Sequence, residues 1–235
     1  MDWVWSHAAA IWSLTLSHIG LSIPPIVIGF VISIPLGYWA SRSPAARSVL
    51  LTLGNILYTI PGLALVVLVP VLLGLSLLNP LNVIVALTIY SIALMVRSAA
   101  DAFASVSASV EESATAQGYS ALQRFAQVEL PLAGPVLLAG LRVVSVSTIS
   151  LVTVGALVGI DSLGNFFTDA FQRNFLLEAV VGFVLVLVLA AVFDLVLSQI
   201  GRLLMPWNRE RRVKASVLTP ELAVAAGPTA DGSAG

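Results

Sequence analysis

Long uncharged stretches dominate this chain, and short charged segments separate them. Residues 19–40 and 48–96 contain no Asp, Glu, Lys or Arg. A helix needs about 20 largely apolar residues to cross a bilayer. The second stretch is long enough for two such helices, with turn chemistry at Asn79-Pro80. The pattern therefore predicts five membrane-spanning helices, near residues 19–40, 56–74, 81–99, 133–158 and 177–203.

Composition supports an all-α integral membrane protein. Of 235 residues, 58% are hydrophobic and only 10% are charged, and the mean hydropathy is +1.00. A soluble domain usually carries about 25% charged residues. The net charge of −1 argues against a nucleic-acid partner. The first 41 residues hold no Lys or Arg, so no basic secretory leader is expected and the first apolar segment should remain in the mature protein.

The chain offers little chemistry of its own. It has no cysteine and only two histidines, too few for a convincing histidine metal site. Its one lysine, Lys214, follows Val213, so the Gly-Lys-Ser/Thr loop that holds nucleotide phosphates is missing. No catalytic, cofactor or metal site is predicted, and ATP chemistry would need a separate chain. A membrane-embedded enzyme would need clustered acid–base groups, whereas a passive channel would work without ATP.

The basic residues predict the orientation, because cytoplasmic loops of membrane proteins are enriched in Lys and Arg. With the N-terminus outside, the outer segments hold only Arg173. The inner segments then hold Arg42, Arg47, Arg97, Arg124, Arg202, Arg209, Arg211, Arg212 and Lys214. This bias places residues 97–131 and the C-terminus in the cytoplasm.

Residues 97–131 form the longest charged interruption and predict a helix–turn–helix on the membrane surface. Glu111–Gln117 is expected to be a short helix that ends at Gly118, since glycine adopts a positive φ without steric cost. Ser120 can cap a second helix. That helix would present an apolar knob between two charged residues, formed by Leu122, Phe125 and Ala126 and flanked by Glu112 and Arg124. Such a knob would suit docking in a groove of a partner protein; the alternative is a surface-lying connector without a partner.

The spacing within this segment resembles the EAA loop of ABC importer permeases. That pattern is Glu-Ala-Ala, three residues, Gly, nine residues, Ile, one residue, Leu-Pro. Residues 112–131 match it at every spacing, with Ser113 in place of the middle Ala and Val128 in place of Ile. The resemblance implies a type I ABC importer permease fold with a cytoplasmic coupling helix. It assigns ATPase coupling to Glu111, Glu112, Ala114, Gly118, Leu122, Arg124, Phe125, Leu130 and Pro131.

Other segments look like one branch of that family, the permeases that import osmoprotectants such as glycine betaine, carnitine, choline or proline betaine. The resemblance covers residues 14–205 and is carried by residues 60–65, 97, 141–142, 154–159 and 162–164. Permeases of methionine importers also have five spans and similar loops. An amino-acid importer of that type is therefore the alternative.

The resemblance also implies a set of partners in a bacterial inner (cytoplasmic) membrane. These are a second permease subunit, identical or merely similar, two ATPase subunits that bind ATP and Mg, and an extracytoplasmic substrate-binding protein. The binding protein is expected to dock on the outer loop at residues 159–177. The candidate docking residues are Asp161, Asn165, Asp169 and Arg173, and the alternative is an ordinary solvated loop.

Two ionisable residues lie inside predicted spans. Arg142 and Asp194 would each lie about 10–12 Å from the cytoplasmic end, at 1.5 Å per helical residue. Charges at such depth are costly unless they are paired or face water. The hypothesis is that they pair; alternatively Arg142 faces the pathway, and Asp194 snorkels or stays protonated.

The chain is expected to divide into three parts. Residues 1–13, with Trp3, Trp5 and Trp12, suit an interfacial helix on the outer surface, because Trp rings prefer the headgroup layer. Residues 14–205 would form the transmembrane domain. Residues 206–235 lack enough apolar surface to fold alone and are predicted to be a disordered cytoplasmic tail.

Overall fold

The structure, a computed structural model, describes residues 2–207 and is helical throughout, without strands in that part of the chain. The predicted tail from residue 208 onward lies outside the described residues. The helices in chain order are α1 (Asp2–Ser6), α2 (Ala8–Arg42), α3 (Pro44–Thr59), α4 (Gly62–Leu73), α5 (Pro80–Ala104), α6 (Ala108–Ala116), α7 (Ala121–Arg124), the π-helix η1 (Phe125–Glu129), α8 (Leu130–Val152), the 3-10 helix η2 (Thr153–Val158), α9 (Asn165–Arg173) and α10 (Leu176–Leu204).

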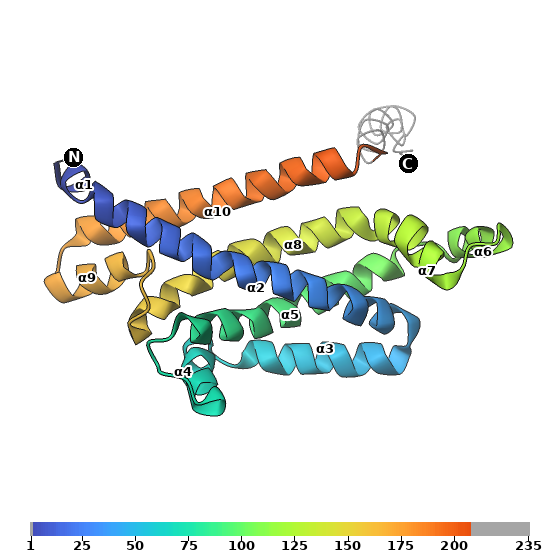
Figure 1. Ribbon diagram of the computed structural model, residues 1–235, viewed down its shortest axis with the longest axis horizontal. Helices are drawn as coiled ribbons and strands as arrows, with labels where there is room; N and C mark the ends of the chain where they lie inside the picture. The colour runs from blue at the N-terminus through green and yellow to red at the C-terminus, as the bar shows by residue number, and fades with distance from the viewer. Residues whose placement is uncertain (1, 208–235) are drawn as a thin grey trace, which may run out of the picture.

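Five passes run along the long axis of the molecule. Within the described residues, the helical segments 8–42, 80–104, 121–158 and 176–204 are each long and apolar enough to cross a membrane, and the bent pair α3 and α4 supplies a fifth crossing if it counts as one span. The passes alternate in direction, so α1 and the end of α10 lie at opposite ends of the molecule (Figure 1). The predicted all-α membrane architecture is confirmed.

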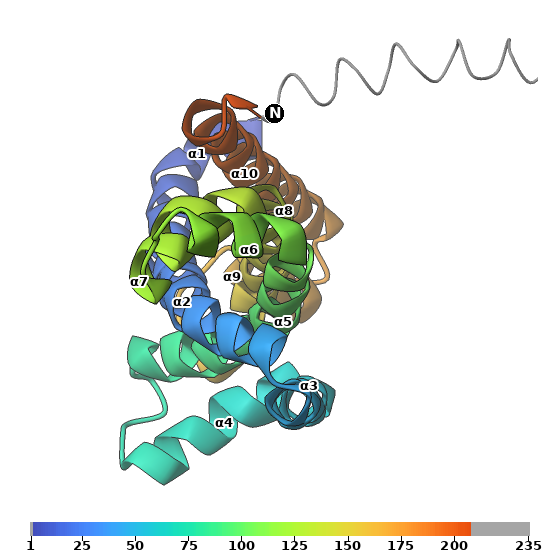
Figure 2. The ribbon, with the colours of Figure 1, turned by 90° about the vertical axis from the view of Figure 1, so that its right-hand side faces the viewer.

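The second pass differs from the prediction of one continuous helix over residues 56–74. It begins at Pro44, with the Ser43 hydroxyl accepting a hydrogen bond from the Ala46 N–H at 3.3 Å. It then breaks at Ile60-Pro61, and α4 leaves α3 at an angle of 101°. Ile60 has a ψ of 127°, because a following proline disfavours the helical conformation of the residue before it. Figure 2 shows α3 and α4 to one side of the bundle, away from α10.

The first pass is longer than a membrane requires. The 35 residues of α2 extend about 50 Å at 1.5 Å per residue, against about 30 Å for the hydrocarbon core of a bilayer. Residues 8–13 are accordingly the first turns of α2, and only α1 precedes them. The surface helix expected within residues 1–13 is thus divided at His7.

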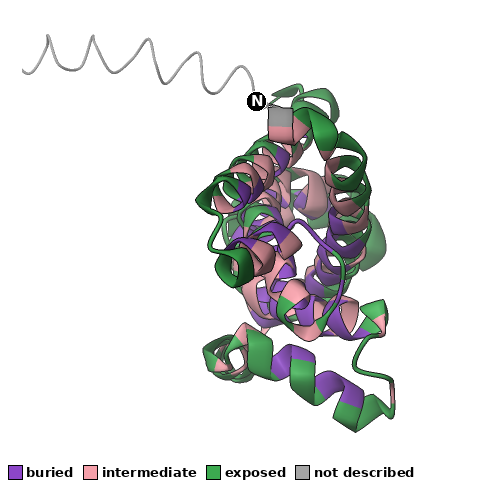
Figure 3. Ribbon diagram, turned by 90° about the vertical axis from the view of Figure 1, so that its left-hand side faces the viewer, coloured by how far each residue is buried: buried purple, intermediate pink, exposed green. Residues whose placement is uncertain are grey.

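The core is formed by close packing of α2 on α5. A Cβ added at Gly37 would lie 2.3 Å from the Ala99 Cβ, and one added at Gly29 would lie 2.4 Å from the Ser91 Cβ. Only glycine permits this approach of the two helix backbones. Buried residues face inward between the helices, while exposed residues cover the outside, including much of α4 (Figure 3). Polar and charged side chains gather at the two ends of α2, around Arg42 at one end and His18 at the other.

Candidate functional site

The α6–α7 segment lies at one end of the bundle, where α2 and α5 end and α8 begins (Figures 1 and 2). Helix α6 ends at Gly118, whose φ is +86°. The Gly118 N–H donates to the Thr115 carbonyl at 3.0 Å, and the Tyr119 N–H donates to the Ala114 carbonyl at 3.1 Å. This pair of bonds is a Schellman motif, which needs a left-handed residue at the glycine position. The predicted role of Gly118 as the end of the first helix is confirmed.

Ser120 begins the second helix, as predicted. Its hydroxyl accepts from the Gln123 N–H at 3.4 Å, and the Gln123 side chain accepts from the Ser120 N–H at 2.9 Å, forming a capping box. The helix then continues through the π-turn η1 directly into α8. Pro131 lies within this continuous helix, just after the π-turn.

A buried carboxylate connects this segment to the first span. The Glu129 side chain is 1% exposed, and its Oε1 accepts from the Arg124 Nε at 2.8 Å. Its Oε2 lies 2.6 Å from the Arg42 Nη2 without hydrogen-bond geometry, so that contact is electrostatic. The Arg42 Nη1 also donates to the Glu111 Oε2 at 2.5 Å, and the Arg124 Nη1 donates to the Thr115 hydroxyl at 3.0 Å. One ion cluster thus joins α2, α6, α7 and η1.

An aromatic cluster lies beside these charges. The Tyr38 ring centroid is 4.8 Å from that of Phe125 and 5.3 Å from that of Phe103. The Arg42 guanidinium carbon lies 5.1 Å from the Tyr38 centroid, within cation–π range. Phe125 is therefore part of the packing beneath the segment, and the predicted three-residue knob is wrong at this position. Burial of a large ring against two others is more favourable than leaving it exposed.

The other residues of this segment divide between its outward face and the core. Leu122 is 76% exposed, and Glu112 and Ala126 are exposed as well. A cavity of about 480 Å³ between the two helices is lined by residues that include Glu112 and Arg124. Ala114 is buried, and Leu130 packs on the core of α5 and α8.

Sequence reasoning assigned no coupling role to Arg42, Glu129 or Tyr38. Glu129 stands next to the predicted Leu130-Pro131, but Arg42 lies in a different part of the chain. Helical spacing predicts which residues share one face of a helix, three or four positions apart. It does not predict contacts between residues of separate spans. The only signal for Arg42 is that it is the first charge after the first apolar stretch.

The hypothesised pair of Arg142 and Asp194 is present. Arg142 on α8 donates to Asp194 on α10 through Nε to Oδ1 and Nη2 to Oδ2, both at 2.6 Å. This two-bond geometry is the strong form of an arginine–carboxylate contact. The side chains are 39% and 33% exposed, so the pair lies at the outside of this chain's own bundle.

At the opposite end, His18 ties three segments together. Its Nε2 lies 3.0 Å from the Ile149 carbonyl of α8, and its Nδ1 lies 3.2 Å from the Leu163 N–H in the loop before α9. A neutral imidazole that donates at Nε2 and accepts at Nδ1 satisfies both contacts. The Ile149 carbonyl is free to accept because the Thr153 N–H bonds to Ser150 and Leu151 at the end of α8. His18 is another residue to which the sequence analysis gave no role.

The four predicted docking residues lie in the segment before α10, without forming one cluster. Asp161 accepts a hydrogen bond from the Asn165 amide at 2.9 Å. Arg173 instead contacts Glu178, a buried residue of α10, at 3.5 Å. Asp169 is partly exposed on α9. Asp161 and Asn165 are therefore the pair that the fold brings together.

Comparison with known proteins identifies the family. The family model described as "Binding-protein-dependent transport system inner membrane component" matches residues 33–210. The chain belongs to this family. It is therefore a permease, the membrane component of a transport system that works with an ATPase and a substrate-binding protein. The nucleotide is bound by the ATPase, and residues 2–207 of the permease contain no group of side chains suited to a metal ion.

Individual relatives agree with this assignment. The permease is 30% identical over 200 residues to the choline transport system permease protein OpuBB of Bacillus subtilis (strain 168), covering 84% of this chain and 89% of that protein. It is also 30% identical to the osmoprotectant import permease protein OsmY of Salmonella typhimurium, over 80% of each chain.

The fold is shared with solved ABC importers. An inward-facing structure of the MetNI methionine ABC transporter matches with a TM-score of 0.70 at 20% identity, over 87% of this chain and 98% of that one. The predicted ABC importer permease, rather than an embedded enzyme or a passive channel, is confirmed.

We expect Arg42→Gln to destabilise the permease more than Arg47→Gln. Removing one partner of a buried charge costs about 3–5 kcal/mol, and the remaining bond from Arg124 should keep the loss near the lower figure. Arg47 pairs with Asp101 at an exposed site, where such a contact contributes about 0–1 kcal/mol. Melting temperatures in detergent provide the measurement, and the double variant with Glu129→Gln should lose less than the sum of the singles. Equal losses for both arginines would show that Glu129 does not depend on Arg42.

Exchanging the charges of the Arg142–Asp194 pair should preserve the fold, whereas Asp194→Asn should not. The single variant leaves an uncompensated arginine in a span, at a cost of about 2.5–3.5 kcal/mol by insertion scales. The double variant Arg142→Asp with Asp194→Arg keeps the opposite charges together. The yield of monodisperse protein in gel filtration reports the difference. An exchange variant that is as poor as the single variant would contradict this expectation.

Proposed function

We propose that this permease carries osmoprotectants of the quaternary ammonium class into a bacterial cell. The observation that supports this most is the similarity to the choline permease OpuBB, which extends over nearly the whole of both chains. OsmY of Salmonella typhimurium, named for osmoprotectant import, has the same 30% identity. The methionine transporter is less similar in sequence, at 20% identity.

The proposed complex contains two permease subunits, two ATPase subunits and one extracytoplasmic binding protein. The N-terminus faces outward and the C-terminus faces the cytoplasm, as the nine basic residues of the inner segments indicate. Residues 14–205 form the transmembrane domain, and the match of the family model over residues 33–210 is consistent with that extent. The binding protein docks on the segment before α10.

Coupling to the ATPase takes place through α6 and α7. Glu112 and Leu122 face outward from this segment and meet the ATPase, while Arg124 and Glu111 hold it to the bundle. Rigidity supports this proposal, since the Schellman motif, the capping box and the ion cluster of Glu129 leave the two helices little freedom. A stroke applied to α7 would then reach α8 through a continuous helix and α2 through Arg42.

Uptake measurements test the substrate. Labelled choline, glycine betaine, carnitine and methionine are offered to a strain without its own importers that expresses this permease with its ATPase and binding protein. We expect uptake of at least one quaternary ammonium compound, which a catalytically inactive ATPase abolishes. Uptake of methionine alone would overturn the proposal in favour of the amino-acid importer.

Gly118→Val should reduce transport at least about ten-fold while the amount of permease in the membrane stays unchanged. A β-branched residue is strained at φ +86°, which would misalign α6 and α7. A Cβ at Gly118 would meet no atom within 4 Å, so steric conflict is not the cause. Gly118→Asn is the matched control, because asparagine tolerates the left-handed region, and it should retain most of the transport. Full activity of the valine variant would count against coupling through this turn.

A further inference from the structure

Helix α3 exposes two faces of different chemistry. Val49, Leu53 and Ile56 are each more than half exposed and share one face, four and three residues apart. The residue before each of them is also exposed but polar, so a second face lies about 100° away at 3.6 residues per turn. With one further turn, this polar face consists of Ser48, Thr52, Asn55 and Thr59.

The exposed sides of two other spans lack such a division. Between residues 23 and 32, every exposed residue of α2 is Ile or Val. Between residues 180 and 196, every exposed residue of α10 is apolar as well. These surfaces suit lipid, where polar side chains are costly. The polar face of α3 therefore calls for surroundings other than lipid.

Asn55 is the member of the polar face that lipid accommodates least. A hydroxyl can be satisfied within its own helix, as Thr59 shows by donating to the Ile56 carbonyl at 2.7 Å. An amide has two N–H donors and an acceptor oxygen, which one backbone carbonyl does not satisfy. Asn55 lies 11 residues after Pro44, the start of α3, or roughly 16 Å along the helix. Its short side chain does not reach the headgroup layer from there, so it must meet water or protein.

A charged residue lies beside this face on α5. Helices α3 and α5 run in opposite directions, since Arg47 pairs with Asp101 and the rings of Tyr58 and Tyr90 are 6.0 Å apart. Arg97 stands one turn before Asp101 and thus at the level of the first half of the polar face. It is exposed, and within residues 2–207 it makes no ion pair. A charge in a span needs water or a counter-charge, so Arg97 independently indicates water on this side of the bundle.

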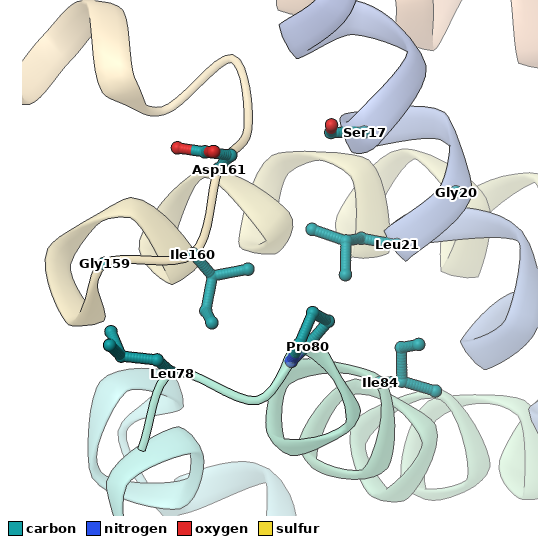
Figure 4. A pocket seen from close by; sticks show the side chains of 9 residues that line it. All are labelled: Ser17, Gly20, Leu21, Leu78, Pro80, Ile84, Gly159, Ile160 and Asp161. Atoms are coloured by element: carbon teal, nitrogen blue, oxygen red, sulfur yellow. The ribbon is translucent and has the colours of Figure 1, made fainter. Parts of the chain in front are cut away.

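The pocket at the opposite end of the bundle has a different lining. It holds about 460 Å³ between α2 and the start of α5. The Asp161 carboxylate at its edge is directed away from the space between Ser17, Leu21 and Pro80 (Figure 4). The surface that remains is mostly apolar. A row of polar side chains along a span is therefore a feature of α3, toward the α6–α7 end.

We propose that the polar face of α3, with Arg97 of α5, lines the cytoplasmic half of the translocation pathway, while the face of Val49, Leu53 and Ile56 meets lipid. The solute then passes along hydroxyl and amide groups that can replace part of its hydration. The polar face ends where Pro61 breaks the span, so the bend marks its upper limit. The proposal rests on the proposed function in that it requires a transporter, but it holds for any polar solute.

Cysteine labelling tests this assignment, because the chain has no cysteine of its own and a thiol reacts as its thiolate, which forms in water rather than in lipid. Thr52→Cys and Asn55→Cys probe the polar face. Leu53→Cys and Ile56→Cys are the matched controls, since each is the next residue along α3, at the same depth and more than half exposed. Inside-out vesicles that contain the full transporter are treated with the membrane-impermeant reagent sulfonatoethyl methanethiosulfonate, with and without ATP.

We expect the two cysteines on the polar face to react at least about ten-fold faster than the two controls, because a thiolate is disfavoured in lipid. Equal rates, or faster labelling of the controls, would overturn the proposal. So would four unreactive cysteines with and without ATP, a result that would instead indicate a face buried against the second permease subunit.

Uptake by the same variants separates this proposal from the proposed function. After labelling, uptake of a quaternary ammonium compound should fall at least about five-fold for Asn55→Cys and less than about two-fold for Ile56→Cys, because only the first adduct narrows the pathway. Undiminished uptake by fully labelled Asn55→Cys would refute the pathway and leave the proposed function intact. If the unaltered permease imports no quaternary ammonium compound while the labelling pattern holds, the proposed function fails and the pathway stands.

Discussion

The buried carboxylate of Glu129 is the constraint on which the α6–α7 end depends. A charge that is 1% exposed must be compensated by neighbouring charges, because its hydration is lost. Two arginines from different elements provide this compensation, Arg124 from α7 and Arg42 from the end of α2. Neither element can leave without uncovering the carboxylate, so the end of the first span and the surface helices are obliged to move together. Such a link is what force transmission through a short surface segment requires.

The first span is held at its other end by neutral groups. His18 donates to α8 and accepts from the loop before α9, and between the two ends the glycines of α2 lie directly against α5. These three contacts make α2 a rigid connection between the two ends of the bundle. A shift of the α6–α7 segment would therefore be transmitted to the loop before α9, over the roughly 36 Å of helix between Arg42 and His18 at 1.5 Å per residue.

Local sequence signals predicted where most helices lie, whereas most contacts between residues of separate helices were not predicted. Hydrophobic length located four spans, because a bilayer sets the length of a helix, and Gly118 and Ser120 marked a turn through their own backbone chemistry. The break at Ile60-Pro61 was missed, because hydropathy contains no information on backbone geometry. The proline itself indicates the break, since it disfavours the helical conformation of Ile60. Phe125 was misplaced because helical spacing tells which residues share a face, and the rings of Tyr38 and Phe103 decide which face is buried. Arg142 and Asp194 were paired correctly, because the cost of charge in a membrane limits the choices.

Two carboxylates of this permease differ in whether an arginine compensates their charge. Asp194 meets Arg142 through two bonds, so the pair carries little net charge into the surrounding membrane or subunit. Asp161 meets an amide and, among the described residues, no ion-pair partner. A compensated charge stabilises helix packing but attracts little. On this ground we assign Arg142 and Asp194 to the architecture of α8 and α10.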